Sequence, residues 1–311
     1  MKKFFVILTL LAGLSACQTP ERGPQPFPNA EPPIMLVRST EEMANWIADH
    51  YWDAWLDSLD CFSADTSLVG GILFEDFQNA ANQYAILLSA IPAQKAVHAQ
   101  NRLWNKLSDP EFKHPRVAEK LFMAAEILFY NPISDWRNEE FYLPALSWKL
   151  QQHEDEMVLE RYREQQRICQ LNRLGEVAAD FEYQVPGKEV QRMHNLRTPY
   201  TLLFFSNPEC PVCEEIIGSF MASDVLNQAI ETQQLTLLNL YIDQELDRWM
   251  NYRHHFPKTW INAFDPNFSL RDNDRYAIRA IPSLYLLDSE KRVLLKDATP
   301  QQVVRALQSM R

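Results

Sequence analysis

Apolar residues recur at two different spacings along this chain, and the spacing changes near residue 180. Before that point they recur every three or four residues, as on one face of a helix. The first helix begins with Ser39 as N-cap and Glu42 three residues later, a pattern in which each side chain satisfies a backbone donor of the other. Further helices are predicted at 72–90, 92–107, 115–130, 138–150 and 154–173, with Gly175 ending the last. No glycine lies between Ile72 and Leu174, so we expect an independent helical domain.

After residue 180 the spacing predicts strands. Two short alternating stretches, 180–185 and 189–193, flank the turn Pro186-Gly187 and predict a hairpin. The continuous apolar run Tyr200–Phe205 has the length of a buried strand, and Asn207-Pro208 ends it. Later predicted elements are a helix at 224–232, a strand at 235–243, a helix at 245–254 that precedes Trp260, a loop at 265–267, a hairpin of 284–287 and 292–295, and a helix at 300–310. We therefore expect an α/β domain after the helical one.

The N-terminal end carries the marks of an export signal. Lys2 and Lys3 precede the apolar stretch Phe4–Leu14, which is too short to span a bilayer as a stable helix. The following Leu14-Ser15-Ala16-Cys17 resembles a bacterial lipobox, in which a peptidase cuts before the cysteine and lipid is attached to Cys17. An ordinary signal peptide and a membrane-spanning anchor are the alternatives. We expect a protein of the cell envelope, lipid-anchored and facing the periplasm, where disulfides persist.

The sequence after the signal divides into three parts. A signal peptide at 1–16 is followed by a proline-rich stretch, which predicts an extended tether at 17–38. A helical domain at 39–175 and an α/β domain at 176–311 complete the chain. The net charge of -11 and the lack of any basic cluster argue against a nucleic-acid partner, and 46% hydrophobic residues are enough for a real core.

Two cysteines stand where the apolar strand gives way to a helix. Cys210 and Cys213 are separated by Pro211-Val212, and proline suits the first turn of a helix, where its missing N–H costs nothing. The free N–H groups and the positive end of the helix dipole favour a thiolate at Cys210. Cys213 lies one turn further along, close enough to attack a mixed disulfide formed on Cys210. The pair therefore has the arrangement of a redox dithiol.

A Cys-x-x-Cys directly after the first core strand resembles the active site of the thioredoxin-like superfamily. A second mark is the segment 280–288, Ala-Ile-Pro-Ser-Leu-Tyr-Leu-Leu-Asp, which is similar to the stretch where thioredoxins carry a cis-proline facing the dithiol. The resemblance implies that Pro282 and the backbone of Ile281 line the substrate groove. The order of hairpin, β-α-β, insertion, β-β and α is similar to the TlpA-like branch of that superfamily.

The chain after the tether also resembles a family of bacterial envelope lipoproteins that join an uncharacterised helical domain to a C-terminal thioredoxin-like domain. The matching stretches are 65–68, 172–175, 179–181, 202–210, 241–243, Trp249 and 281–288. The family implies an α/β thioredoxin-like C-terminal domain preceded by an all-α helical domain. It implies no function for the helical half.

The resemblance implies a thiol-disulfide oxidoreductase that acts on proteins or small thiols through mixed disulfides. In that mechanism Cys210 attacks and Cys213 resolves the mixed disulfide. Asp243 and Glu245 are candidates for a carboxylate beneath the dithiol that moves protons, and the alternative is that they are ordinary acids at a strand end and a helix start. We expect no cofactor and no metal. Without a reductase domain of its own, the protein would need a membrane electron donor.

One departure from the thioredoxin pattern bears on the direction of the reaction. Thioredoxins usually place tryptophan before the first cysteine and Gly-Pro between the two, whereas Glu209 and Pro211-Val212 stand in those places here. The acidic neighbours Glu209, Glu214 and Glu215 would oppose a thiolate at Cys210 if they lie close to it. A disulfide is strongly oxidising when its reduced form is stabilised, so we expect a reductase or an isomerase rather than a strong oxidase.

Other uses of the dithiol fit the sequence less well. Peroxiredoxin chemistry requires Thr or Ser three residues before the cysteine, where Asn207 stands. Metal capture with His254 or His255 is conceivable, but two cysteines supply only half of a closed tetrahedral site. Haem attachment fails because glutamate follows the second cysteine. The alternative from another class is a lipid-anchored binding module with a structural or vestigial dithiol, and insulin reduction by wild type and Cys210→Ser would separate the two.

Two further cysteines belong to the helical half. Cys61 and Cys169 could close that domain as a structural bridge between its first and last helices. They could equally be small buried hydrophobic residues, as free cysteines often are. We favour unpaired thiols, because neither cysteine belongs to a recognisable disulfide framework.

Overall fold

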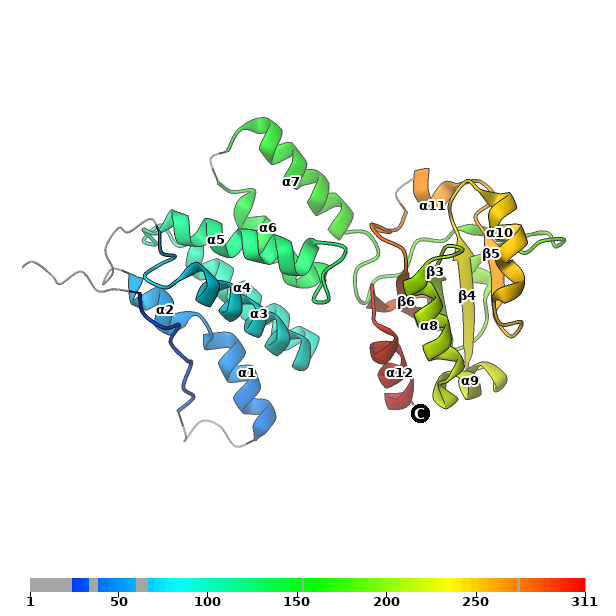
Figure 1. The fold of residues 1–311 in the computed structure, drawn as a ribbon, viewed down its shortest axis with the longest axis horizontal. Helices are drawn as coiled ribbons and strands as arrows, with labels where there is room; N and C mark the ends of the chain where they lie inside the picture. The colour runs from blue at the N-terminus through cyan, green and yellow to red at the C-terminus, as the bar shows by residue number, and fades with distance from the viewer. Residues whose placement is uncertain (1–23, 34–38, 60–66, 153, 273–274, 311) are drawn as a thin grey trace, which may run out of the picture.

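The computed structural model describes residues 24–33, 39–59, 67–152, 154–272 and 275–310, without the side chains of Arg271 and Asp272. The predicted signal peptide, the predicted lipidation site Cys17 and the thiol Cys61 lie outside the described residues. Within the part described, none of the helices combines the length and the hydrophobicity needed to cross a bilayer. A helical body and a mixed α/β body follow one another along the chain, as expected (Figure 1).

The first body consists of helices packed around one hydrophobic core. Its elements are α1 (Thr40–His50), α2 (Asp53–Asp57), α3 (Phe74–Ala90), α4 (Ala93–Leu107), α5 (Pro115–Ala125), the π-helical turn η2 (Glu126–Tyr130), α6 (Glu139–Lys149) and α7 (Glu156–Cys169). Large aromatic side chains dominate the core, and Trp55, Phe122 and Tyr142 are fully buried. Full burial of one such apolar side chain stabilises a fold by roughly 1.5–3 kcal/mol. The body therefore has a core of its own.

The six predicted helical segments are confirmed, with two interruptions. Ser39 is the N-cap of α1, and its hydroxyl accepts a hydrogen bond from the N–H of Glu42 at 3.1 Å. The first segment divides into α1 and α2, and the segment 115–130 changes from α5 to the π-helical η2 at Glu126. The apolar spacing predicts where a helix lies, but it does not resolve such local changes of winding.

Gly175 belongs to the connection between the two bodies and not to a helix. Helix α7 ends at Cys169 with Gln170 as C-cap, so the prediction that Gly175 ends this helix is wrong. Gly175 has a φ of 81°, in the left-handed region that favours glycine. Its N–H donates to the carbonyl of Val293 at 2.8 Å. This bond attaches the incoming chain to the edge of the sheet.

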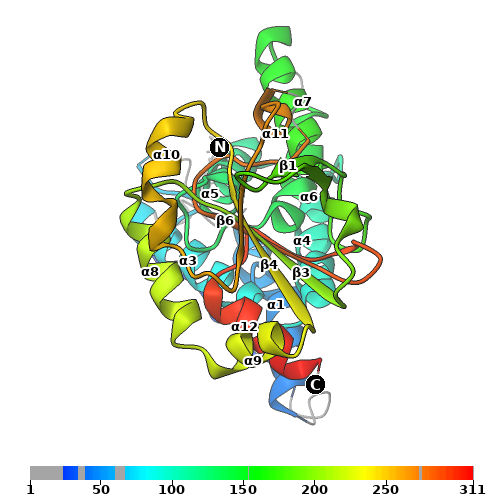
Figure 2. The ribbon, with the colours of Figure 1, turned by 90° about the vertical axis from the view of Figure 1, so that its right-hand side faces the viewer.

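The second body is a seven-stranded mixed sheet with helices on both faces (Figure 2). Its strands are β1 (Glu182–Gln184), β2 (Val190–Arg192), β3 (Tyr200–Phe205), β4 (Leu235–Tyr241), β5 (Ile261–Phe264), β6 (Ser283–Leu287) and β7 (Val293–Lys296). Its helices are η3 (Met193–Asn195), α8 (Pro211–Met221), α9 (Asp224–Glu231), α10 (Leu246–Tyr252), η4 (Arg253–His255), α11 (Ser269–Asp272) and α12 (Pro300–Ser309). The strand order is β2-β1-β5-β4-β3-β6-β7, with β3, β4 and β5 parallel and the other neighbours antiparallel.

Strand β3 runs through the middle of the sheet and serves both of its cores. Leu202 and Phe204 pack on the face covered by α8, α9 and α12, whereas Leu203 and Phe205 pack on the opposite face. Successive side chains of a strand point to opposite faces, so a strand buried on both sides is apolar throughout. This is the reason for the continuous apolar run in the sequence. Because β3 ends at Phe205, the segment that follows leaves the sheet at the C-terminal end of this central strand.

The residues between Trp260 and the loop at 265–267 form strand β5, which the sequence pattern did not predict. Within β5 only Ala263 is fully buried, and Asn262 interrupts the apolar pattern. The strand forms because β4 offers it a parallel partner, with Leu238 opposite Ile261. Pairing with a distant strand overrides the weak local preference here.

Candidate functional site

The two cysteines of the dithiol are joined in a disulfide at the start of α8. The chain leaves β3 at Phe205 and reaches Cys210, the N-cap of the helix, after four residues. The Cα atoms of Cys210 and Cys213 are 5.2 Å apart. The N–H of Cys213 donates to Sγ of Cys210 at 3.2 Å. The helix N-terminus therefore offers a hydrogen bond to the sulfur at which a thiolate would form.

The two sulfurs differ in how far a partner can approach them. Cys213 is 1% exposed and packs among the apolar side chains between α8 and the sheet, including Phe204 and Trp260. Cys210 is only partly buried, and the neighbouring Val212 is 53% exposed. An incoming sulfur would therefore meet Cys210 first, while Cys213 lies beneath it.

Two of the three acidic neighbours of the dithiol are engaged by α10. The carboxylate of Glu209 forms an ion pair with Arg248, which also pairs with Glu245 at 3.2 Å. The carboxylate of Glu214 accepts a hydrogen bond from the Tyr252 hydroxyl at 2.7 Å. Burial and this hydrogen bond raise the pKa of Tyr252 to about 12. The carboxylates therefore destabilise a thiolate at Cys210 less than three free acids would, because a guanidinium faces one of them.

The peptide bond between Ile281 and Pro282 is cis, as the resemblance to thioredoxins implies. The bond lies directly before the first residue of β6, and Ile281 packs against the apolar clusters on both faces of the sheet. A side chain of the helical body reaches it, because Nη2 of Arg137 lies 3.5 Å from the carbonyl oxygen of Pro282. The cis bond and the dithiol helix line the same cleft, described below.

The two acids predicted as a proton relay lie at the end of β4. Asp243 accepts a hydrogen bond from Nδ2 of Asn207 at 2.6 Å, which ties it to the loop before the dithiol. The side chain of Glu245 is 70% exposed and pairs with Arg248. Both line a depression of about 420 Å³ on the α10 side. The relay stays a prediction, and Asp243 is the one of the two acids that is bonded to the dithiol loop.

Cys169 and the adjacent histidines His254 and His255 are the other residues that the sequence suggests as metal ligands or disulfide partners. Cys169 is a buried free cysteine at the end of α7. Among the residues that the structure describes, no group of three or more His, Cys, Asp or Glu side chains is placed to hold a metal ion. His254 and His255 lie in η4 with ring centroids 4.1 Å apart.

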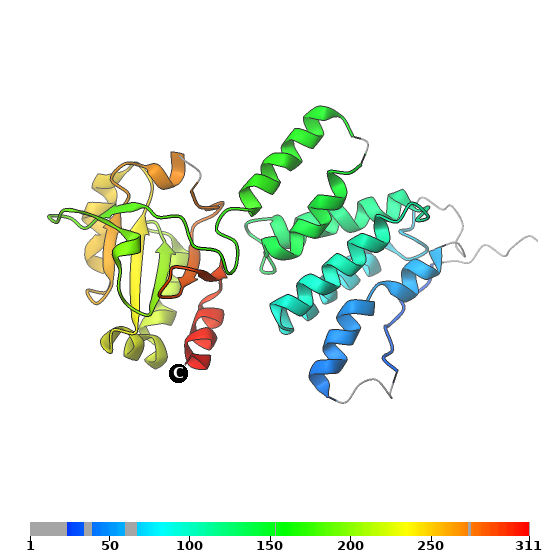
Figure 3. The same ribbon diagram turned by 180° about the vertical axis from the view of Figure 1, so that it is seen from behind.

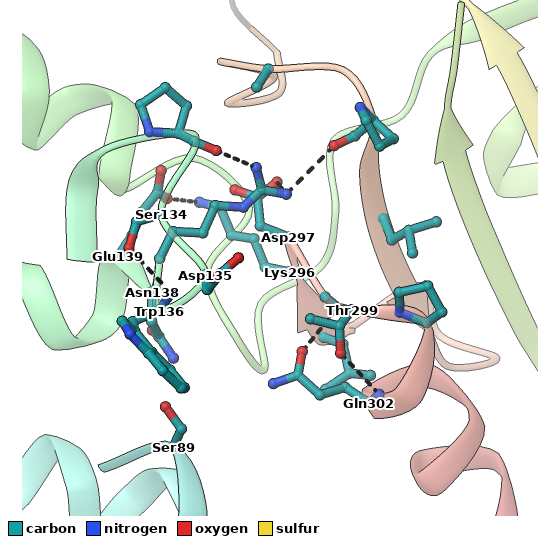
Figure 4. Close-up of a pocket in the computed structure, with 18 of the residues that line it drawn as sticks. Ser89, Ser134, Asp135, Trp136, Asn138, Glu139, Lys296, Asp297, Thr299 and Gln302 are labelled. Carbon is teal, nitrogen blue, oxygen red and sulfur yellow. Dashed lines mark hydrogen bonds and ion pairs between the residues drawn. The ribbon is translucent and has the colours of Figure 1, made fainter. Parts of the chain in front are cut away.

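Sequence reasoning did not identify the cleft between the two bodies (Figure 4). It has a volume of about 830 Å³, and its lining comes from the end of α3, the loop before α6, the α8 helix, the cis-proline segment and the start of α12. Figure 3 shows the same two bodies from behind, with α12 on the side of the sheet that faces the helices. No spacing in the sequence could reveal it, because each wall belongs to a different domain.

A buried ionic cluster forms part of the lining of this cleft. The side chain of Glu139, at the start of α6, is 4% exposed and pairs with Arg279 at 2.9 Å and with Lys296. The guanidinium of Arg279 stacks 4.1 Å above the ring of Tyr130 and donates to the carbonyl of that residue. Arg279 lies just before the cis bond and Lys296 ends β7, so the cluster attaches the helical body to the segment that leads into β6 and to the neighbouring strand β7.

Comparisons with known proteins agree with this architecture. Residues 12–172 match the family described as "Domain of unknown function (DUF5106)", and residues 199–293 match the family described as "Thioredoxin-like". None of the curated proteins matches the chain.

Several solved structures are similar to this one. A thioredoxin-like protein from Bacteroides caccae is 31% identical with a TM-score of 0.78, and the match covers 92% of this chain and 99% of that one. The C-terminal domain of an uncharacterized protein from Bacteroides fragilis is 42% identical over 44% of this chain and 98% of that one, with a TM-score of 0.43. The thioredoxin domain of a thiol-disulfide oxidoreductase from Bacteroides vulgatus is 16% identical over 44% of this chain and 97% of that one, with a TM-score of 0.40.

Proposed function

This chain belongs to the family of the Bacteroides caccae thioredoxin-like protein, with a DUF5106 domain followed by a thioredoxin-like domain, and we propose from this premise that it is a thiol-disulfide oxidoreductase. One observation carries the proposal. The partly exposed Cys210 stands at a helix N-terminus in a disulfide with the buried Cys213, and the helix that bears them lines one cleft with the cis-proline bond. This arrangement allows disulfide exchange at Cys210, after which the buried Cys213 attacks the mixed disulfide.

The proposed reaction is a transfer of two electrons from the dithiol to a substrate disulfide. The thiolate of Cys210 attacks one substrate sulfur, the substrate disulfide breaks, and the other substrate sulfur leaves as a thiolate that takes up a proton. Deprotonated Cys213 then attacks Sγ of Cys210 and releases the second substrate sulfur. The substrate is reduced to two thiols, and Cys210 and Cys213 become the disulfide.

We propose the protein as a reductase or an isomerase rather than a strong oxidase. The support comes from Glu214 and Glu215 on the first turns of α8, whose carboxylates disfavour a thiolate at Cys210, while Arg248 offsets the charge of Glu209. We expect a reduction potential well below the value of about -120 mV of the strongest periplasmic oxidant. A potential near that value, measured by equilibration with glutathione, would overturn this part of the proposal.

A dithiol that reduces substrates must be reduced again after each cycle. The described chain holds no second redox domain, so we propose a membrane electron donor that reduces the disulfide by the same exchange chemistry. Lipid on Cys17 would hold the protein at that membrane in the cell envelope, facing the periplasm. Expression of the full precursor in a bacterium, followed by mass spectrometry of the protein from the membrane fraction, tests the anchor, with Cys17→Ala as the variant that cannot be lipidated. A wild-type protein whose N-terminus carries no lipid would contradict it.

Reduction of insulin by dithiothreitol tests the activity itself. We expect the wild type to accelerate precipitation of the insulin B chain, and Cys210→Ser to fall to the uncatalysed rate. Cys169→Ser is the matched control, because this thiol is buried at the end of another helix and should be dispensable. Equal rates for wild type and Cys210→Ser would overturn the proposal and favour a lipid-anchored binding module with a structural disulfide.

A further inference from the structure

The cleft between the two bodies is bounded on one side by the helix that follows Cys210 and by the cis-proline segment, and on the other by the helical domain; neither cysteine of the dithiol is among its lining residues. Val212 and Ile216 of α8 and the cis-proline segment form the first wall. The loop that runs from Pro132 to Asn138, here called the 132–138 loop, forms the second. The volume of about 830 Å³ falls in the range of roughly 300–1,000 Å³ that holds drug-sized ligands. Such a space admits several residues of an extended chain and excludes a folded domain.

The 132–138 loop is fixed against the thioredoxin-like domain. Within it, Arg137 donates to the carbonyl of Pro132 at 2.7 Å and pairs with Asp297 at 3.6 Å. Directly after it, the buried Glu139 pairs with Arg279 and Lys296, which flank the cis-proline strand. The loop therefore keeps a defined position opposite the dithiol helix instead of moving as a free surface loop.

The exposed, uncompensated charge in this cleft is negative. Its three cations face two carboxylates, Arg137 pairing with Asp297 and both Arg279 and Lys296 with the buried Glu139, so one positive charge is left over at the buried cluster. Two lining acids are exposed and have no ion pair among the described residues, namely Asp135 of the 132–138 loop and Glu215 of α8. Figure 4 shows Asp135 between its own loop and the segment that leads into α12.

Apolar surface accompanies these two acids. Ile133 is 84% exposed, and Val212 on the opposite wall is 53% exposed. Trp136 lies on the same loop and is partly buried, with its ring directed toward Ser89 at the end of α3 (Figure 4). The lining thus offers apolar contacts together with a negative potential, the complement of a chain segment that carries both apolar and basic side chains.

We propose that this cleft is the docking site for the cysteine-bearing segment of a protein substrate. The helical domain selects segments with a basic residue and an apolar residue beside the cysteine. Asp135 and Glu215 are the specificity-determining residues, and they act through the charge that they place on either side of the cleft. A small anionic thiol is disfavoured by the same charges. The inference rests on the proposed function, because it assigns the substrate of the same dithiol.

The test measures how fast Cys210 takes up a peptide, with Cys213→Ser as the parent so that the mixed disulfide accumulates. Two peptides carry one cysteine beside leucine and are flanked either by two lysines or by two glutamates. Each is supplied as its disulfide with thionitrobenzoate. The thiolate of Cys210 attacks the peptide sulfur, and the coloured thionitrobenzoate leaves with the electron pair. The rate measured with a Cys210→Ser/Cys213→Ser variant is first subtracted from each rate. The difference is then divided by the rate at which mercaptoethanol releases thionitrobenzoate from the same peptide disulfide.

We expect the lysine peptide to react about fivefold faster than the glutamate peptide at low salt, the size of a favourable interaction between partly exposed charges. In the parent background, Asp135→Asn alone should roughly halve this ratio, and Asp135→Asn/Glu215→Gln should bring it close to one. High salt should have the same effect as the double substitution. Glu189→Gln, an exposed acid on the remote hairpin, is the matched control and should leave the ratio unchanged.

The outcomes separate this inference from the proposed function. A ratio near one in the parent, or a ratio that survives the double substitution, overturns the inference while the proposed function stands. Failure of both peptides and of a small neutral disulfide to react with Cys210 overturns the proposed function and this inference with it. A ratio that falls with Asp135→Asn supports a substrate-selecting role for the helical domain.

Discussion

Cys169 and Cys210 are both cysteines at helix ends, yet the structure surrounds them in opposite ways. Cys169 is the last residue of α7 and is fully buried, and burial followed by the charge of Glu139 raises its pKa to about 12. Cys210 precedes the first turn of α8, is partly exposed, and receives a hydrogen bond from the N–H of Cys213. The end of a helix carries a partial negative charge and its beginning a partial positive one.

The difference shows that residue type alone does not make a redox site. A cysteine behind the negative end of a helix and away from water stays a protonated thiol that serves as packing. A cysteine ahead of the positive end and open to a partner can exchange disulfides. The two domains differ in the same way. The thioredoxin-like domain carries the dithiol, whereas the helical domain supplies one wall of the cleft and charged residues that hold this wall in place.

The largest expected effect is in the rate of thiol alkylation. Reduced protein treated with iodoacetamide at pH 7 should be modified at Cys210 and hardly at Cys169. A pKa of about 12 instead of roughly 8.5 lowers the thiolate fraction by about three thousandfold, before any effect of burial. The modification of Cys169 should rise with pH up to that pKa, because the thiolate fraction grows about tenfold per pH unit below it. Mass spectrometry of the alkylated peptides measures both rates.

Denatured protein is the control for this measurement. In guanidinium both cysteines lose their surroundings, so they should be alkylated at similar rates. Equal alkylation of the two cysteines in the native protein would contradict the contrast between the two helix ends.

A second, smaller effect should follow from removing the charge that holds the surroundings of Cys169 together. Glu139→Gln leaves Arg279 and Lys296 partly buried without their counter-charge, which should lower the free energy of unfolding by about 3 kcal/mol. Lys296 also donates to the carbonyl of Leu171 just beyond α7, at 2.6 Å, so loosening this cluster should make Cys169 easier to alkylate. Urea unfolding of this variant measures the free energy of unfolding, and alkylation of the same variant measures how easily Cys169 is reached.

The neighbouring residue provides a matched control. Glu140 pairs with Arg173, whose side chain is 41% exposed, so Glu140→Gln should cost less than about 1 kcal/mol. It should leave the alkylation of Cys169 unchanged. If the two substitutions cost the same free energy of unfolding, the buried cluster has no special role in joining the domains.

The smallest expected effect concerns the surroundings of Cys210. Arg248→Ala frees the carboxylate of Glu209, which then disfavours the thiolate and hence the reduced form of the dithiol. The reduction potential should become more negative by on the order of 10 mV. Equilibration with glutathione buffers, read by mass spectrometry, measures the shift.

Arg163→Ala is the control for this experiment. Arg163 pairs with Glu156 and Glu160 on α7, so its loss removes a comparable exposed ion pair without changing the charge near the dithiol. A potential that rises in Arg248→Ala, or that shifts equally in both variants, would show that the charge of Glu209 is not sensed at Cys210.

The sequence by itself determined the elements and the reactive centre. The helical segments, the buried strand before Cys210 and the final helix are confirmed, because each depends on neighbours a few residues away. The same holds for the disulfide of Cys210 and Cys213, which are three residues apart. The cis bond before Pro282 was predicted from a family resemblance and is also present.

Only the tertiary structure decided what surrounds that centre. β5 exists because β4 pairs with it, and Gly175 anchors the linker because Val293 lies opposite it. The cleft and its ionic cluster bring Glu139 to Lys296, residues that are far apart in the sequence and belong to different domains. The spacing of apolar residues predicts which face of one segment is buried, but it carries no information on which distant segment packs against that face. A charged residue at the start of a helix also looks the same in the sequence whether it faces water or a buried cation.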